Sequence, residues 1–171
     1  MSISKSLLPE FDYEMQTTRK VLERVPDDKF DWKPHPRSTA MGGLATHVAN
    51  IPTWAINAVK QDSLDLAPRG IPVPPMEVAK GNDLLLQTFD SNVAKAREAI
   101  AGAADESLFQ PWTLLMNEKA IMTLPRVAVI RSFVLNHLIH HRGQLSVYLR
   151  LNDIPVPSIY GPSADEGSFM G

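Results

Sequence analysis

The sequence contains no cysteine, which excludes disulfide bonds, thiolate nucleophiles and cysteine metal ligands. Any transition metal must therefore be held by nitrogen and oxygen donors, and histidine is the leading candidate among them. The chain also lacks an excess of basic residues, because 17 lysines and arginines stand against 19 acidic residues for a net charge of −2. We therefore expect no nucleic acid partner.

Long apolar runs are missing as well. No segment approaches the ~18 uninterrupted apolar residues of a membrane span, and the N-terminal segment lacks the apolar run and cleavage pattern of a secretory signal. We expect a cytoplasmic protein without a membrane partner. The chain does have 171 residues with 44% hydrophobic content, which is enough for one substantial core and predicts a single domain over residues 1–171.

Proline is plentiful, with 14 residues, and it separates stretches in which apolar residues recur at helical spacing. The pattern predicts four helices, over residues 7–25, 39–60, 76–103 and 125–151. Ser38 or Thr39 can cap the second helix, and Pro52 should kink it. Residues 62–75 form a long connection, and residues 108–124 form either a short hairpin or an irregular loop. We expect an all-α fold, a four-helix bundle.

The most informative pattern lies in the fourth predicted helix, where His137 and His141 are four residues apart. A step of about 100° per residue places both imidazoles on one apolar stripe, so we expect them to face the core. His140 falls near the edge of this stripe and is the weaker ligand candidate. Arg142 and Arg150 lie outside it and should be solvated or paired. The apolar members of the stripe are Ile130, Phe133, Val134, Leu145 and Tyr148.

Two imidazoles buried side by side require compensation. Each needs a hydrogen-bond partner, their protonated forms repel each other, and no acidic residue shares the stripe. One divalent metal ion would satisfy both rings at once. In the alternative interpretation, the rings form hydrogen bonds with the backbone or with Gln144 and Tyr148 in an ordinary core. The pair alone gives the two interpretations about equal weight.

A third histidine strengthens the metal hypothesis. His47 shares a stripe with Ile51 and Trp54 in the second predicted helix, so in a bundle its side chain points toward the axis at which the fourth helix presents its pair. Three histidine ligands leave a coordination position open, which is typical of catalytic metal sites. Trp32, Trp54 and Tyr148 are most simply packing residues, and only a cavity beside them would make them substrate contacts.

These residues resemble the DinB-like (YfiT-like) superfamily of metal-dependent proteins, and the resemblance covers most of the chain. It implies an up-down-down-up four-helix bundle, usually a homodimer, with one divalent ion, Ni²⁺ or Zn²⁺, held by His47, His137 and His141. Relatives with assigned activities are thiol-dependent transferases, including enzymes that use bacillithiol or mycothiol, and a thiol-dependent isomerase. The segments that carry the resemblance are Leu44-Ala45-Thr46-His47, His137-Leu138-Ile139-His140-His141-Arg142-Gly143-Gln144-Leu145 and Tyr148-Leu149-Arg150, with the loop 32–36 and the tail 154–166.

One feature departs from the superfamily pattern. Gly42 and Gly43 stand before His47, where a firmer helix start is common in relatives. Adjacent glycines weaken a first helical turn, so we expect looser local geometry there, with the ligand itself retained.

Two functions from different classes fit these residues. The first is a metal-dependent thiol transferase or hydrolase, in which a low-molecular-weight thiol or a water attacks a small-molecule substrate; three neutral ligands leave the full charge of the ion to acidify that nucleophile. The second is a non-catalytic, stress-related module that binds metal or a ligand. The sequence names no general base, although Asp153, Asp165 or Glu166 in the tail can fold back over the site.

The fourth predicted helix also bears on assembly, because it is apolar around more than half of its circumference. This exceeds what one bundle core requires. A homodimer would cover the remainder. The apolar residues spread around the helix are Leu135, Leu138, Ile139, Val147 and Leu149.

Overall fold

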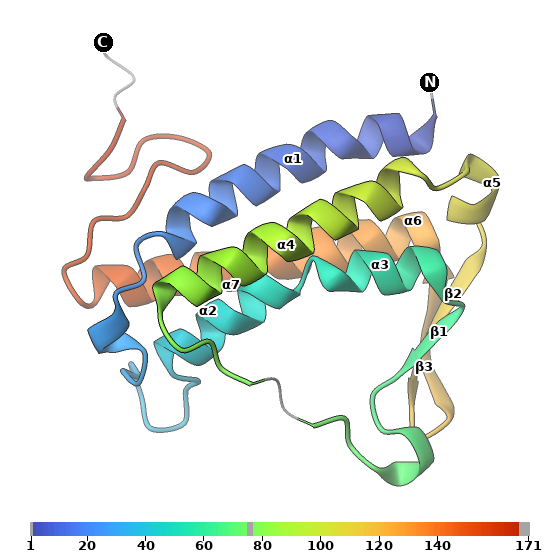
Figure 1. Ribbon diagram of the computed structural model, residues 1–171, viewed down its shortest axis with the longest axis horizontal. Helices are drawn as coiled ribbons and strands as arrows, with labels where there is room; N and C mark the ends of the chain where they lie inside the picture. The colour runs from blue at the N-terminus through green and yellow to red at the C-terminus, as the bar shows by residue number, and fades with distance from the viewer. Residues whose placement is uncertain (1, 75–76, 168–171) are drawn as a thin grey trace.

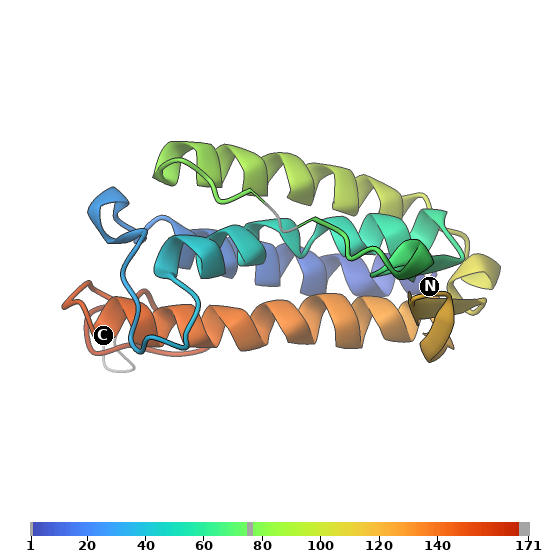
Figure 2. The ribbon, with the colours of Figure 1, turned by 90° about the horizontal axis from the view of Figure 1, so that it is seen from below.

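Four helical segments lie side by side in a computed structural model that describes residues 2–74 and 77–167 (Figures 1 and 2). They are α1 (Ile3–Leu22), α2 (Met41–Asn50) followed by α3 (Thr53–Lys60), α4 (Asn82–Ala101), and the continuous run of α6 (Arg126–Val129), η3 (Ile130–Leu135) and α7 (Asn136–Arg150). The first and last segments run in one direction and the other two run in the opposite direction (Figure 1). None of the described helices is long and apolar enough to cross a membrane.

The second predicted helix is divided in two. Pro52 separates α2 from α3, and this break confirms the predicted kink. The predicted cap is wrong, because Ala40 precedes α2 and neither Ser38 nor Thr39 caps it.

The first and third predicted helices begin at other residues than expected. α1 begins at Ile3, because the Ser2 hydroxyl caps it by accepting a hydrogen bond from a backbone N–H of the first turn. α4 begins only at Asn82. Met76, the predicted first residue of this helix, and Pro75, the predicted last residue of the long connection, lie outside the described residues.

A three-stranded mixed sheet covers one end of the helices, so the prediction of an all-α four-helix bundle is wrong. Its strands are β1 (Ser63–Asp65), β2 (Pro111–Met116) and β3 (Lys119–Pro125), in the order β1-β2-β3. β1 pairs with β2 in parallel, and β2 pairs with β3 antiparallel. Short helical turns η1 (Asp27–Lys29), η2 (Pro68–Gly70) and α5 (Asp105–Leu108) complete the described elements.

The hairpin alternative for residues 108–124 is correct, and the end of β1 holds its turn. Asn117 and Glu118 form the two-residue loop with φ of 50° and 63°, the left-handed conformation of a type I′ turn. The Asp65 carboxylate accepts hydrogen bonds from the N–H groups of Asn117 at 3.0 Å, Glu118 at 2.7 Å and Ala67 at 2.9 Å. These backbone bonds, that of Ala67 first, lower the pKa of Asp65.

The last helical segment contains one π-helical stretch, η3, which changes the face that is buried. A π-helical turn holds one extra residue, and this offsets the following face by about 100°. His137 and His141 consequently lie half-buried beside the core, and the prediction that they lie in the middle of the buried stripe is wrong. The buried residues are Arg126, Val129, Ile130, Val134 and Leu135 up to the end of η3, and Leu138, Arg142, Leu145 and Leu149 in α7.

The buried face of α7 includes a charged residue, Arg142, which is 1% exposed. Its guanidinium donates hydrogen bonds to the Glu14 carboxylate at 2.7 Å, the Thr18 hydroxyl at 3.2 Å and the Tyr160 hydroxyl at 2.6 Å. The Tyr160 hydroxyl donates to Glu14 at 2.9 Å, and burial followed by this bond raises the pKa of Tyr160. Arg142 is therefore paired, as expected, but it lies inside the core. Its hydrogen bonds link the C-terminal tail to α1 and α7.

Most of the apolar circumference of α7 and η3 is covered within one chain. Leu135, Leu138 and Leu149 are buried, Ile139 is half-buried, and Val147 is 56% exposed. The apolar excess from which we infer a homodimer is therefore small, and the homodimer stays a prediction.

Two glycines lie in contrasting environments. A Cβ atom added at Gly42 would lie 2.3 Å from Cδ1 of Phe30, whereas one added at Gly143 meets nothing within 4 Å. Gly42 thus allows the loop before α2 to pack directly on the helix. The expected loosening is not observed, since Gly42 and Gly43 are both helical residues of α2.

We expect the two alanine substitutions to have opposite effects. Gly42→Ala should lower the free energy of unfolding by about 1–3 kcal/mol, because the Phe30 ring must move. Gly143→Ala should raise the free energy of unfolding by up to about 1 kcal/mol, because alanine has a higher helix propensity than glycine at an exposed position inside a helix. Urea unfolding of both variants measures the difference. A destabilised Gly143→Ala protein would contradict the open environment of Gly143.

Removing the charge of Arg142 should be more damaging than either change. Arg142→Leu leaves Glu14 buried and unpaired, so we expect a loss of about 3–5 kcal/mol in the free energy of unfolding. The double variant Glu14→Leu, Arg142→Leu removes both charges and should recover part of that loss. Urea unfolding of wild type and the variants tests this, and purely additive losses would show that the two residues are not coupled.

Candidate metal centre

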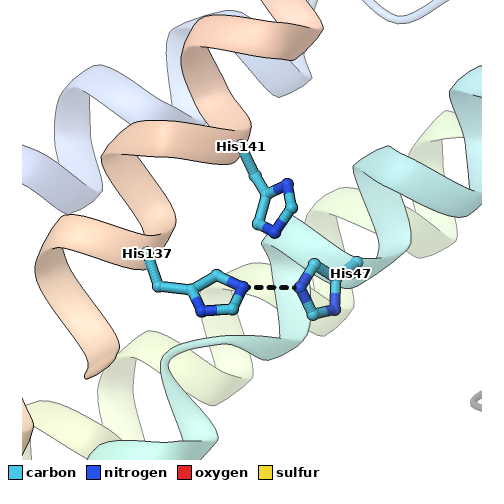
Figure 3. Close-up of side chains that lie close together, drawn as sticks. All are labelled: His47, His137 and His141. Carbon is cyan, nitrogen blue, oxygen red and sulfur yellow. Dashed lines mark hydrogen bonds between the residues drawn. The ribbon is translucent and has the colours of Figure 1, made fainter. Parts of the chain in front are cut away.

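The fold brings the three predicted histidines together. His47 lies on α2, and His137 and His141 lie on α7, which packs against α2. Their candidate ligand atoms lie within 4.8 Å of one another, and the Nε2 atoms of His47 and His137 are 3.1 Å apart. Figure 3 shows the three rings turned toward the same space between the two helices. The three histidines therefore form a cluster able to hold a metal ion.

The polar residues near the cluster differ in whether they form hydrogen bonds with its histidines. The ring of His140 lies 4.9 Å from that of His141, but this exposed residue is not part of the cluster. Gln144 Oε1 lies 2.7 Å from His141 Nδ1, which is the hydrogen bond that the alternative interpretation expected. The Tyr148 hydroxyl instead donates to the backbone carbonyl of Thr39 at 3.3 Å.

Aromatic rings border the cluster on one side. The Trp54 ring meets His137 edge to face at 5.0 Å and His47 at 5.7 Å between centroids. Phe133 stacks on Trp54 at 4.8 Å, and both rings are half-buried. Trp54 therefore packs against Phe133 and also borders the histidine cluster. The sequence predicted the packing role only.

Burial keeps two of the imidazoles neutral. It is the main cause that lowers the pKa of His137 to about 4, and the charges of His141, His47 and His140 add to it in that order. Burial, followed by the charge of His141, also lowers the pKa of His47. At neutral pH each ring is therefore in the neutral form, with one nitrogen lone pair, which is the form that binds metal ions.

The spacing of the nitrogens fits a shared ion. A distance of 3.1 Å between the Nε2 atoms of His47 and His137 is shorter than two Zn–N bonds of about 2.0–2.1 Å each, so both atoms can reach one ion. Nitrogen ligands of this kind suit zinc and nickel alike.

No carboxylate joins the cluster among the residues that the structure describes. Asp165 pairs with Arg150, and Glu166 pairs with Arg24. Asp153 is exposed just beyond the end of α7. Among the described residues, the tail therefore does not bring a carboxylate to the cluster, because arginines on α7 and after α1 hold two of these side chains elsewhere.

The cluster is separate from a cleft on the other side of α2. This cleft, of about 390 Å³, lies between α2, α4 and residues 77–80. Thr46 and Asn50 line it from α2, but no histidine does. The two features share a helix and are distinct sites.

We expect the stability of EDTA-treated protein to depend on His137 at acid pH. The pKa of His137 lies at about 4 in the folded state, below its ordinary 6.5, so the unfolded chain takes up a proton first. This contribution to stability is fully present above about pH 6.5 and is lost as the pH falls toward about 4. His137→Gln should flatten the decline in melting temperature, and the exposed control His140→Gln should not. Parallel curves for all three proteins would contradict the assignment.

Known proteins match this chain in sequence and in fold. The sequence profile of the DinB family matches residues 1–168. An uncharacterised Bacillus subtilis protein, YrdA, is 24% identical over 168 residues, which cover 96% of this chain and 92% of the relative.

Two solved structures show the same fold. A DinB-like protein from Bacillus cereus superposes with a TM-score of 0.68 at 20% identity, covering 91% of this chain and 97% of that one. A DinB-like protein from Bacillus subtilis, YjoA, superposes with a TM-score of 0.66 at 18% identity, covering 88% and 95%. Because the family profile spans nearly the whole sequence, the resemblance inferred from the histidine pattern is confirmed, and the chain belongs to the DinB family.

Proposed function

We propose that this protein binds one Zn²⁺ or Ni²⁺ ion at His47, His137 and His141 and is a thiol transferase or hydrolase that acts on an electrophilic small molecule. The observation that carries the proposal is the convergence of three imidazoles from two helices without a carboxylate among the described residues of the cluster. Three neutral ligands leave the charge of an ion uncompensated. When bound, such an ion lowers the pKa of a thiol or water that it contacts.

Residues of this chain would bind the ion and line the substrate site. It has no cysteine, so in a thiol transfer the nucleophilic sulfur must belong to a low-molecular-weight cosubstrate. His47, His137 and His141 provide the binding atoms. Trp54 and Phe133, stacked beside His137, offer an apolar wall against which the carbon skeleton of the electrophile can lie and which excludes water from one side.

A second candidate function is a non-catalytic metal-binding module, and one observation favours it. Within the described part of the chain, no aspartate or glutamate belongs to the histidine cluster, so a general base for turnover is not among its members. The two candidates share the metal site and differ only in turnover.

The metal site is tested first by measuring metal content. We expect untagged wild-type protein, loaded with Zn²⁺ or Ni²⁺ and desalted, to retain close to one ion per chain by plasma mass spectrometry. The double variant His137→Ala, His141→Ala removes two of three ligands and should retain little. His140→Ala is the matched control on the same helix and should retain the wild-type content. Equal metal in the double variant would contradict the site.

Tryptophan fluorescence tests independently whether the ion binds at the histidine cluster. Trp54 lies 5.0 Å from His137 between ring centroids, so Ni²⁺ in the cluster should quench its emission. The quenching should disappear in Trp54→Phe, whereas Trp112→Phe should keep it. Turnover is then measured as thiol consumption with chlorodinitrobenzene and cysteine, bacillithiol or mycothiol. Stoichiometric metal without turnover in this panel, or in an ester hydrolysis panel, would favour the binding module.

A further inference from the structure

His141 is set apart from the other two histidines by its hydrogen bonding. Its Nδ1 atom lies 2.7 Å from Oε1 of Gln144, one helical turn further along α7. Among the described residues, it is the only histidine of the cluster whose ring bonds to a side chain outside the cluster. The bond comes from the same helix, so it does not depend on how α2 and α7 pack.

This bond determines the tautomer of His141. With the amide oxygen of Gln144 facing the ring, the bond requires the proton on Nδ1, because an amide oxygen only accepts hydrogen bonds. A neutral imidazole has a single N–H, and Nε2 therefore keeps its lone pair. Figure 3 shows one ring nitrogen of His141 directed toward the other two histidines and the other directed away from them. The lone pair is thus available on the side where the cluster converges.

We propose that Gln144 is a positioning residue that holds His141 in the Nδ1–H tautomer and aims its Nε2 atom at the metal. The inference rests on the proposed metal site. It also extends that proposal to the charge of the site, because the partner of a metal-bound histidine is often a carboxylate. Gln144 provides the orientation of such a partner without its negative charge, so the ion's full charge remains available to acidify a thiol or water.

Replacing Gln144 by alanine or by glutamate should affect His141 in different ways. An alanine at position 144 removes the acceptor, and Nδ1 and Nε2 of His141 then compete for the proton. A glutamate keeps the acceptor and adds a charge, which makes the imidazole a stronger donor. In Gln144→Glu, metal affinity should therefore rise while acidification of the nucleophile declines, and in Gln144→Ala metal affinity should decline.

The first test uses metal-free protein and is independent of activity. Long-range ¹⁵N–¹H correlation spectra report which ring nitrogen of each histidine carries the proton. We expect the Nδ1–H form of His141 in the wild type and in Gln144→Glu, and a shift toward the Nε2–H form in Gln144→Ala. Asn136→Ala, which truncates an exposed amide beside His137, is the control and should leave the His141 signals unchanged. An unchanged tautomer in Gln144→Ala would overturn the proposal.

The second test measures Zn²⁺ affinity by competition with a chromophoric chelator. Loss of such a partner typically weakens metal binding by about 10–100-fold, and because Gln144 is exposed we expect the lower end, about 10-fold, for Gln144→Ala. Gln144→Glu should bind at least as tightly as the wild type, and Asn136→Ala should match it. Wild-type affinity in Gln144→Ala would overturn the positioning role while leaving the metal site intact. A wild type that binds no Zn²⁺ would overturn both, and the spectra would then show separately whether Gln144 sets the tautomer.

Discussion

The buried ion pair between Arg142 and Glu14 fixes how α7 is rotated about its own axis, and the histidine cluster depends on that rotation. His141 precedes Arg142 directly, so the two side chains leave the helix about 100° apart. Withdrawing Arg142 from Glu14 would leave a buried charge unpaired at a cost of several kcal/mol, roughly 3–5. Because Glu14 belongs to α1, this helix influences the side of α7 from which His141 projects without contributing a residue to the cluster.

The consecutive residues His141-Arg142-Gly143-Gln144 have different surroundings, because a helix directs successive side chains about 100° apart. His141 faces α2 and the cluster, and Arg142 faces α1 and the core. Gly143 faces open space, and Gln144 reaches back to the ring of His141. One helical turn thus contains a candidate ligand, the residue that sets the rotation of the helix, and the side chain that we propose to orient the candidate ligand.

The sequence allowed the long helices and the His137/His141 pair to be predicted because both depend on local spacing along the chain, and His47 followed from the expected packing of two helices in a bundle. β1 could not be predicted in this way: Ser63–Asp65 is too short for a periodic pattern, and it pairs with residues 113–115, fifty positions away. The position of the histidines relative to the core was missed for another reason. A constant step of about 100° per residue has no place for the extra residue of η3, and nothing in the apolar pattern marks it. Burial of Arg142 was missed because its partner, Glu14, is separated from it by 128 residues.

The offset introduced by η3 has a chemical consequence. Without it, His137 and His141 would continue the buried stripe of Ile130 and Val134, and the other helices would seal the space around the imidazoles. With it, Leu138 and Leu145 take the core positions, and the histidines lie half-buried at its boundary. Burial at that boundary, followed by the charges of the neighbouring histidines, lowers the pKa of His137 to about 4, so the ring is neutral at physiological pH. The boundary position also leaves one side of the cluster accessible, and a substrate requires that access whereas a purely structural metal site does not.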